Sequence, residues 1–157
     1  MQAPQPLAQV HGLSAFDCDE SVLNEWLKRR AFANQVNGAS RTFVVVDERN
    51  QVLAYYALAA GAIANSNAVG TIRRNMPDPI PVMVLGRLAV DRSCQGRQIG
   101  SAMLKDALLR TISVSENVGI RALLVHAIND AAQQFYSQRG FQPSPINPYT
   151  LMLKLPR

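Results

Sequence analysis

The run from Val82 to Ser101 constrains the fold most, because it predicts a strand, a glycine-bearing loop and the first turn of a helix in direct succession. Residues 82–90 are mostly apolar, as expected for a strand covered on both faces. The N-terminus of a helix carries unpaired N–H groups and about half a positive charge, and glycine lets a ligand approach the backbone closely. The run therefore indicates a site for a phosphate-bearing ligand, although many glycine-containing turns bind nothing.

A second buried strand follows this helix. The helix is expected to run from near Gln98 to about Val118, with apolar residues at four-residue spacing, and Gly119 ends it. Residues 122–127 are again strongly apolar. A strand, a long helix and a second strand form a βαβ unit, so the two strands are predicted to be parallel.

The remaining elements alternate between strands and helices. A helix is expected from about Ser21 to Asn34, capped by Asp17 or Asp19, and residues 61–81 are expected to form a loop with a short helical piece. A last helix is expected from Asn129 or Asp130 through Gln138. Further strands are predicted at residues 41–47, 52–60 and 150–155. The fold class is therefore α/β (α+β in some schemes), with a mixed sheet and helices on its faces.

Composition excludes several classes of protein. The 157 residues fit one domain, residues 1–157, and a hydrophobic content of 48% is typical of a globular chain. We see neither a signal peptide nor an apolar run of roughly 20 residues, so we expect a cytoplasmic protein without a membrane. Cys18 and Cys94 lack metal-ligand spacing, and no metal is expected. The net charge of +5 favours an anionic partner such as nucleic acid.

A block near the C-terminus makes the interpretation more specific. Asn129 is followed by Phe135-Tyr-Ser-Gln-Arg-Gly-Phe141, at a fixed distance after the Gln-x-x-x-x-Gly loop. In this order the elements resemble the GCN5-related N-acetyltransferase (GNAT) superfamily over essentially the whole chain. The resemblance implies a single GNAT domain, a mostly antiparallel sheet with one splayed parallel strand pair, and acetyl-CoA as co-substrate.

Three other segments resemble a narrower group. Residues 73–91, 34–43 and 144–152 are similar to the toxins of bacterial GNAT-type toxin–antitoxin pairs, the TacT, KacT and AtaT group. Such toxins acetylate the α-amino group of aminoacyl-tRNA and stop translation. The resemblance implies an aminoacyl-tRNA acceptor, a cognate ribbon-helix-helix antitoxin that binds DNA in the complex, and a homodimer.

The resemblance also assigns the binding of acetyl-CoA. The diphosphate is expected on backbone N–H groups of the loop and the first helical turn, with a charge-assisted contact from Arg97. The pantetheine arm is expected to pair with the strand, where an N–H at Leu88 or its neighbour faces the thioester oxygen. The candidate residues are Leu88, Ala89, Val90, Gln95, Gly96, Arg97, Gln98, Ile99, Gly100 and Ser101. Gln98 stands where the family usually has glycine, and we expect it in ordinary helical geometry, where glutamine costs little.

Tyr136 is the candidate general acid. A tyrosine has an ordinary pKa of about 10, so it stays protonated at neutral pH and can donate to a leaving thiolate. Asn129 is expected to cap its helix and to contact the pantetheine arm. Phe135 and Phe141 are expected to pack in the core, and Phe135 is also a candidate for cofactor binding.

No general base is evident. His126 lies on a predicted buried strand, where a histidine is more often part of the core, although a water relay from it is conceivable. An α-amine has a pKa of about 7.7–8.0, against about 10.4 for lysine, so the missing base favours an α-amine acceptor.

Basic residues fit an RNA acceptor. They lie on the first helix, at the start of the following strand, and around the Val82–Val90 strand, and phosphate contacts from such residues dominate affinity for nucleic acid. The candidates are Lys28, Arg29, Arg41, Arg73, Arg74 and Arg87. Solvated surface charge is the plain alternative for each of them.

Two other functions remain open. A GNAT enzyme acting on small amines or protein N-termini would share every acetyl-CoA residue. A non-catalytic GNAT-like domain that binds RNA or a partner is supported only by Gln98, and the Tyr136 block argues against it.

Overall fold

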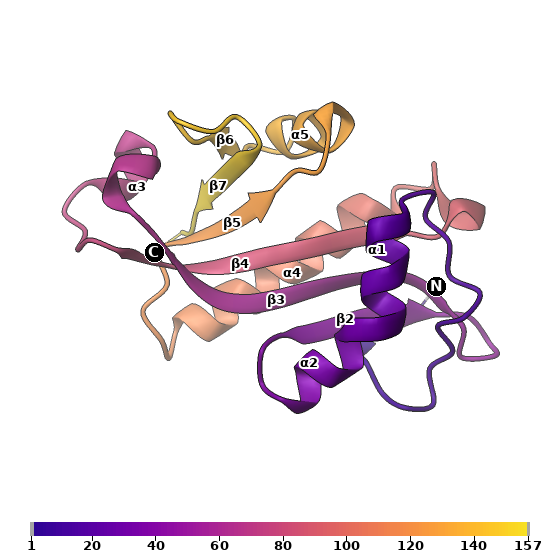
Figure 1. The fold of residues 1–157 in the computed structure, drawn as a ribbon. Coiled ribbons are helices and arrows are strands. Elements are labelled where there is room, and N and C mark those ends of the chain that lie inside the picture. Colours follow the sequence, from indigo (N-terminus) through magenta and orange to yellow (C-terminus); the bar gives the residue numbers. More distant parts are fainter. Residues whose placement is uncertain (1, 157) are drawn as a thin grey trace. The chain divides into compact units, whose positions relative to one another are not determined.

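A computed structural model describes residues 2–156 of the chain (Figure 1). The chain divides into two compact units. Unit 1 comprises Met1–Ala59 and Gly86–Ala107, and unit 2 comprises Ala60–Leu85 and Leu108–Arg157. Strands β3 (Val52–Ile63) and β4 (Ile80–Val90) and helix α4 (Ile99–Ser115) each contribute residues to both units.

The other elements are short. The strands are β1 (Gln5–Pro6), β2 (Arg41–Val46), β5 (Ala122–His126), β6 (Gln142–Pro143) and β7 (Thr150–Lys154). The helices are α1 (Ser21–Trp26), the π-helix η1 (Leu27–Ala31), α2 (Phe32–Val36), the 3-10 turns η2 (Asn65–Asn67) and η3 (Arg92–Cys94), α3 (Gly70–Arg73) and α5 (Asp130–Ser137). No helix among the described residues is long and apolar enough to cross a membrane.

The strands form a mixed sheet in the order β1-β2-β3-β4-β5-β7-β6. Strands β4 and β5 are parallel, with Val82–Leu85 opposite Ala122–Val125, and α4 is the connection between them. The pairs β1–β2, β2–β3, β5–β7 and β6–β7 are antiparallel. The predicted βαβ unit and the mostly antiparallel mixed sheet are therefore confirmed.

In unit 1, helices cover both faces of β3. Tyr55 and Tyr56 are both fully buried, and as neighbours on a strand they point to opposite faces. The Tyr55 hydroxyl donates to the Leu23 carbonyl of α1 at 2.8 Å, and the Tyr56 hydroxyl donates to the Asp106 carboxylate of α4. Figure 1 shows α1 in front of this strand and α4 behind it. The predicted helices on both faces are confirmed here.

The core of unit 2 joins β4, β5, β7 and α3. Its buried residues include Ile72, Ile80, Val82, Leu124 and Met152. The Arg121 guanidinium then closes the C-terminal end of α3, where it donates to the carbonyls of Ile72 at 3.0 Å and Thr71 at 3.1 Å. These carbonyls have no partner within so short a helix, so the arginine satisfies them.

Several predicted boundaries were wrong. The first helical segment extends to Val36, and neither Asp17 nor Asp19 caps it, because Glu20 is the N-cap and makes no side-chain bond. Strand β3 continues through Gly61, which was predicted as loop. A Cβ on Gly61 would lie 2.7 Å from Val84 Cγ2, so this glycine serves a close approach of two strands. The strands β1 and β6 were not predicted, since each has two residues and includes a proline.

The start of α4 also differs from the prediction. The helix begins at Ile99, and Gln98 precedes it with φ +60°. Ordinary helical geometry at Gln98 was therefore a wrong expectation. A left-handed residue other than glycine costs roughly 1–2 kcal/mol, because its Cβ crowds the following carbonyl oxygen.

We therefore expect Gln98→Gly to stabilise unit 1. The gain in the free energy of unfolding should be about 1 kcal/mol, since the removed Cβ penalty exceeds the added entropy of an unfolded glycine of roughly 0.5–1 kcal/mol. Urea unfolding measures the change. The matched control is Gln138→Gly, at φ −65°, which should lower stability. Equal losses for both variants would contradict the interpretation.

Candidate active site

The loop between β4 and α4 is built from two turns and a left-handed residue. Asp91 opens η3, and its carboxylate accepts bonds from the Ser93 N–H at 3.1 Å and the Ser93 hydroxyl at 2.6 Å. Gly96 then takes φ +82°, a conformation that favours glycine. The first helical bond of α4 runs from the Ala102 N–H to the Gln98 carbonyl. The N–H groups of Ile99 and Gly100 precede that bond, so they are outside the helical ladder and available to an anion.

A distant segment holds this loop in place. The Asp17 N–H donates to the Asp91 carboxylate at 2.9 Å, and the Arg92 N–H donates to the Asp17 carbonyl at 2.8 Å. The Gln95 side chain donates to the carbonyls of Val90 at 3.0 Å and Cys18 at 3.3 Å. Gln95 was predicted to bind the cofactor, and the structure shows its amide bonded to the backbone on both sides of the loop.

Hydrogen bonds also tune the carboxylates of this anchor. Burial acts to raise the pKa of Asp91, but the bonds from Ser93 and from the Asp17 N–H outweigh it and lower the pKa. The pKa of Asp17 is lowered by bonds from the Asp19 N–H and the Asn24 side chain. Both groups therefore stay ionised at neutral pH and keep accepting these bonds. Sequence reasoning missed this anchor, because Asp17 and Asp91 are 74 residues apart.

Strand β4 outruns the parallel pair. The register with β5 covers Val82 to Leu85, whereas β4 continues to Val90. Leu88, Ala89 and Val90 therefore lie on the part of the strand beyond that register, which agrees with the predicted splay. An extended ligand arm with amide groups can bond to such a strand.

In unit 2, helix α5 carries the predicted acid. Asn129 is its N-cap, and its side-chain oxygen accepts from the Ala132 N–H at 2.9 Å, which confirms the predicted cap. The Tyr136 ring is buried between Phe135 and Phe141, with centroid distances of 5.2 Å and 5.5 Å. Phe141 is buried as predicted, whereas Phe135 is half-buried beneath the Arg139 guanidinium, 3.8 Å from its ring centroid.

Burial raises the pKa of Tyr136 above its ordinary value. The group is therefore protonated throughout the neutral range, as a general acid requires. His126 differs from its prediction, since its side chain is exposed at the end of β5 and bonds the Thr150 hydroxyl through Nδ1 at 3.2 Å.

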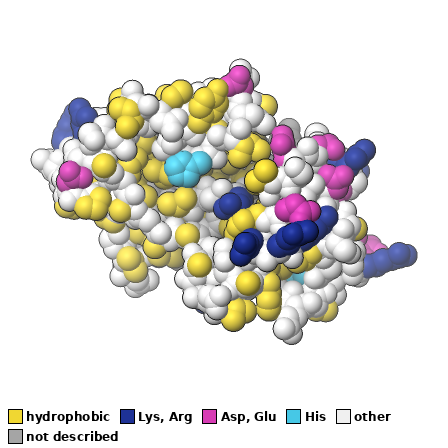
Figure 2. All heavy atoms as spheres, in the orientation of Figure 1, with side chains coloured by type: hydrophobic (Ala, Val, Ile, Leu, Met, Phe, Trp, Pro, Cys, Tyr) yellow, Lys and Arg dark blue, Asp and Glu magenta, His cyan; other side chains and the backbone are white. Residues whose placement is uncertain are grey.

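The predicted basic residues are divided between the units. In unit 1, the side chains of Lys28, Arg29 and Arg41 are exposed, and Arg29 pairs with Glu25 at 2.7 Å. Figure 2 shows Lys and Arg side chains gathered over the α1 and η1 segment with acidic ones beside them. The half-buried Arg87 places its guanidinium 4.5 Å from the centroid of the Trp26 ring. These contacts hold part of the charge in fixed positions.

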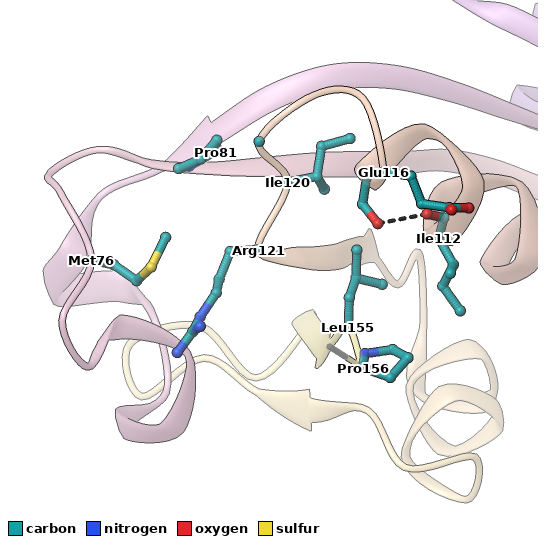
Figure 3. A pocket seen from close by; sticks show the side chains of 10 residues that line it. Met76, Pro81, Ile112, Glu116, Ile120, Arg121, Leu155 and Pro156 are labelled. Atoms are coloured by element: carbon teal, nitrogen blue, oxygen red, sulfur yellow. Dashed lines mark hydrogen bonds between the residues drawn. The ribbon is translucent and has the colours of Figure 1, made fainter.

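In unit 2, Arg73 and Arg74 are exposed at the end of α3. None of the predicted site residues lines the surface pocket in Figure 3, which has a volume of about 490 Å³. Arg121 lines that pocket, and its guanidinium already bonds α3. The described residues contain no group of three or more His, Cys, Asp or Glu side chains that could hold a metal ion.

Comparisons with known proteins agree with this arrangement. Residues 39–143 match the acetyltransferase (GNAT) domain. A "tRNA-acetylating toxin" of Mycobacterium tuberculosis (strain ATCC 25618 / H37Rv) is 45% identical over 151 residues, with 96% of this chain and 90% of that protein covered.

Solved structures give the same result. The structure described as "AtaT complexed with acetyl-methionyl-tRNAfMet" has a TM-score of 0.90 at 30% identity, covering 97% of this chain and 94% of that chain. "Crystal structure of AtaTR bound with AcCoA" has a TM-score of 0.85 at 31% identity, covering 98% and 93%. The chain belongs to the GNAT acetyltransferase family.

Proposed function

We propose that this protein transfers the acetyl group of acetyl-CoA to the α-amino group of an aminoacyl-tRNA and so blocks translation as a toxin. The single observation that carries the proposal is the segment from β4 into α4, where a strand that outruns its parallel partner leads directly to the available N–H groups at the start of a helix. The tRNA acceptor is supported by the relatives, one named for tRNA acetylation and one bound to an acetylated aminoacyl-tRNA.

Each part of acetyl-CoA is assigned to a part of the chain. The diphosphate binds the N–H groups of residues 96–101, with Arg97 adding a charged contact. The pantetheine arm pairs with Leu88 to Val90, and Asn129 contributes to the same arm. A backbone N–H near Leu88 stabilises the charge that develops on the thioester oxygen.

The chemistry then needs one acid. The neutral α-amine attacks the thioester carbonyl, the new C–N bond forms and the C–S bond breaks. The proton of the Tyr136 hydroxyl passes to the thiolate of coenzyme A, and the amine releases a proton to water. The raised pKa of Tyr136 supports this role, because the residue is protonated before the reaction.

The setting of the reaction is also proposed. We infer that the two units act as one domain, residues 1–157, because β3, β4 and α4 run through both. A homodimer in the cytoplasm, neutralised by a ribbon-helix-helix antitoxin that binds DNA in the complex, follows from the resemblance. Support comes from structures of AtaT bound to the C-terminus of the antitoxin AtaR and of the AtaT-AtaR complex with DNA.

Tyr136→Phe tests the acid. Acetyl transfer should fall by roughly 10²–10⁴-fold, because the variant has no hydroxyl proton to donate. Phenylalanine keeps the ring packing, so the dissociation constant for acetyl-CoA should stay within twofold on calorimetry. A variant with full transfer activity would contradict the assignment. Loss of toxicity in cells with intact acetyl-CoA binding would exclude a domain that acts by binding alone, the reading that the Gln98 conformation favours.

Gln95→Ala tests the loop anchor. The variant removes both donors to the carbonyls of Val90 and Cys18, each worth about 1 kcal/mol in a typical neutral bond. We expect acetyl-CoA to bind about 5-fold more weakly on calorimetry, because the loop must be ordered on binding. Gln138→Ala, at an exposed glutamine on α5, is the matched control and should bind normally. Equal affinity of both variants would reject the anchor.

Arg74→Glu tests the RNA surface. Acetylation of charged tRNA should weaken while acetyl-CoA binding is unchanged, since the exposed arginine is assigned to a phosphate. Each phosphate contact removed should lower the slope of log affinity against log salt by about 0.7–0.9. The control is Arg49→Glu, an equal change of charge in the exposed turn before β3. A loss of both tRNA and acetyl-CoA binding would indicate misfolding or a cofactor role.

A further inference from the structure

A pocket of about 280 Å³ lies in unit 2 at the carboxyl end of β5. Its apolar lining comes from three strands, with Ile63 on β3, Val84 on β4 and Leu124 on β5. Its polar lining includes His126 and Thr150, whose side chains bond each other at 3.2 Å. The pocket therefore joins an apolar floor to a hydrogen-bonding edge, which is typical of a site for a small organic ligand.

The position of the pocket along the strands connects it to the reaction. Val84 and Leu124 are register partners, and the parallel pairing ends one residue later, at Leu85 and Val125. His126 is the next residue of β5. On β4, Leu88 follows Val84 by four residues along the strand, and Leu88 is the residue assigned to the thioester oxygen. An acceptor amine that meets that thioester must arrive where the pairing ends.

The wall of the pocket is fixed to the helix that carries Tyr136. The Ala127 N–H donates to the Tyr149 carbonyl at 2.7 Å, and the Gln133 side chain of α5 donates to the Pro148 carbonyl at 2.9 Å. The Tyr149 hydroxyl also donates to the Asp130 carboxylate at the start of α5. The pocket and the acid therefore belong to one hydrogen-bonded body within unit 2.

We propose that this pocket binds the amino-acid part of the charged tRNA and selects aminoacyl groups with uncharged, apolar side chains. The inference rests on the proposed function and specifies its substrate class. The side chain packs on Ile63, Val84 and Leu124, beside Ile146, which is 66% exposed at the rim. The His126 imidazole, held through Nδ1 by Thr150, accepts a hydrogen bond from the α-amino group.

Selection follows from the cost of desolvation. A charged side chain placed on the apolar floor loses its hydration, and no acidic or basic residue other than His126 is among the described residues that line the pocket. An apolar side chain gains free energy in the same place, and differences of even one methylene are worth 10- to 200-fold in such pockets. We therefore expect at least 10-fold discrimination against charged side chains.

The experiment uses the full chain, acetyl-CoA and a single tRNA body charged with methionine, valine, aspartate or lysine by an acylating ribozyme. One tRNA body keeps the RNA contacts constant, so that only the amino acid changes. We expect kcat/KM for methionyl- and valyl-tRNA to exceed that for the aspartyl and lysyl forms by at least 10-fold. Equal rates for all four would overturn the pocket proposal and leave the proposed function standing.

The absence of transfer to every charged tRNA, with transfer to a small free amine, would overturn both proposals. Ile146→Asp places a carboxylate at the rim without touching the core, because this side chain is exposed. It should lower kcat/KM for methionyl-tRNA at least 10-fold, with KM for acetyl-CoA and the melting temperature unchanged. The matched control is Val118→Asp, 57% exposed and outside the pocket, which should change neither value. Equal activity of the two variants would overturn the proposal.

Discussion

The early end of the parallel pairing is the constraint on which the site depends. Strand β4 continues for five residues after Leu85, the last residue in register with β5. A strand inside a complete sheet has its N–H and carbonyl groups bonded on both sides, so it cannot bond a ligand. The part of β4 beyond the register can, and it delivers the chain into the loop at the start of α4. Ligand binding and the fold of this region therefore have one cause.

The loop is positioned by tertiary contacts. Gly96 and Gln98 give it two left-handed residues, and Asp17, Asp91 and Gln95 hold its two ends. A left-handed glutamine costs free energy, so the surrounding bonds must over-determine the conformation. Such strain is common where a backbone is shaped for a ligand, and it accounts for the family's usual glycine at this position.

The two units divide the chemistry. Unit 1 carries the strand and loop assigned to acetyl-CoA, and unit 2 carries Asn129, Tyr136 and the pocket at the end of β5. In unit 2, burial keeps Tyr136 protonated, and bonds to residues 148 and 149 tie the pocket wall to the same helix. An acid and an acceptor site held by one helix keep a constant spacing, which favours an oriented attack on the thioester.

The sequence by itself determined the order of strands and helices, the parallel pair and the Asn129 cap, because apolar periodicity and capping are local properties of the chain. It also carried the resemblance that identified Tyr136. Tertiary structure decided the φ of Gln98, the strand conformation of Gly61, the exposure of His126 and the anchoring by Asp17. Each of these depends on residues distant in sequence, whose approach no local pattern encodes. Gly61, for example, is in a strand because β3 must pass close to Val84.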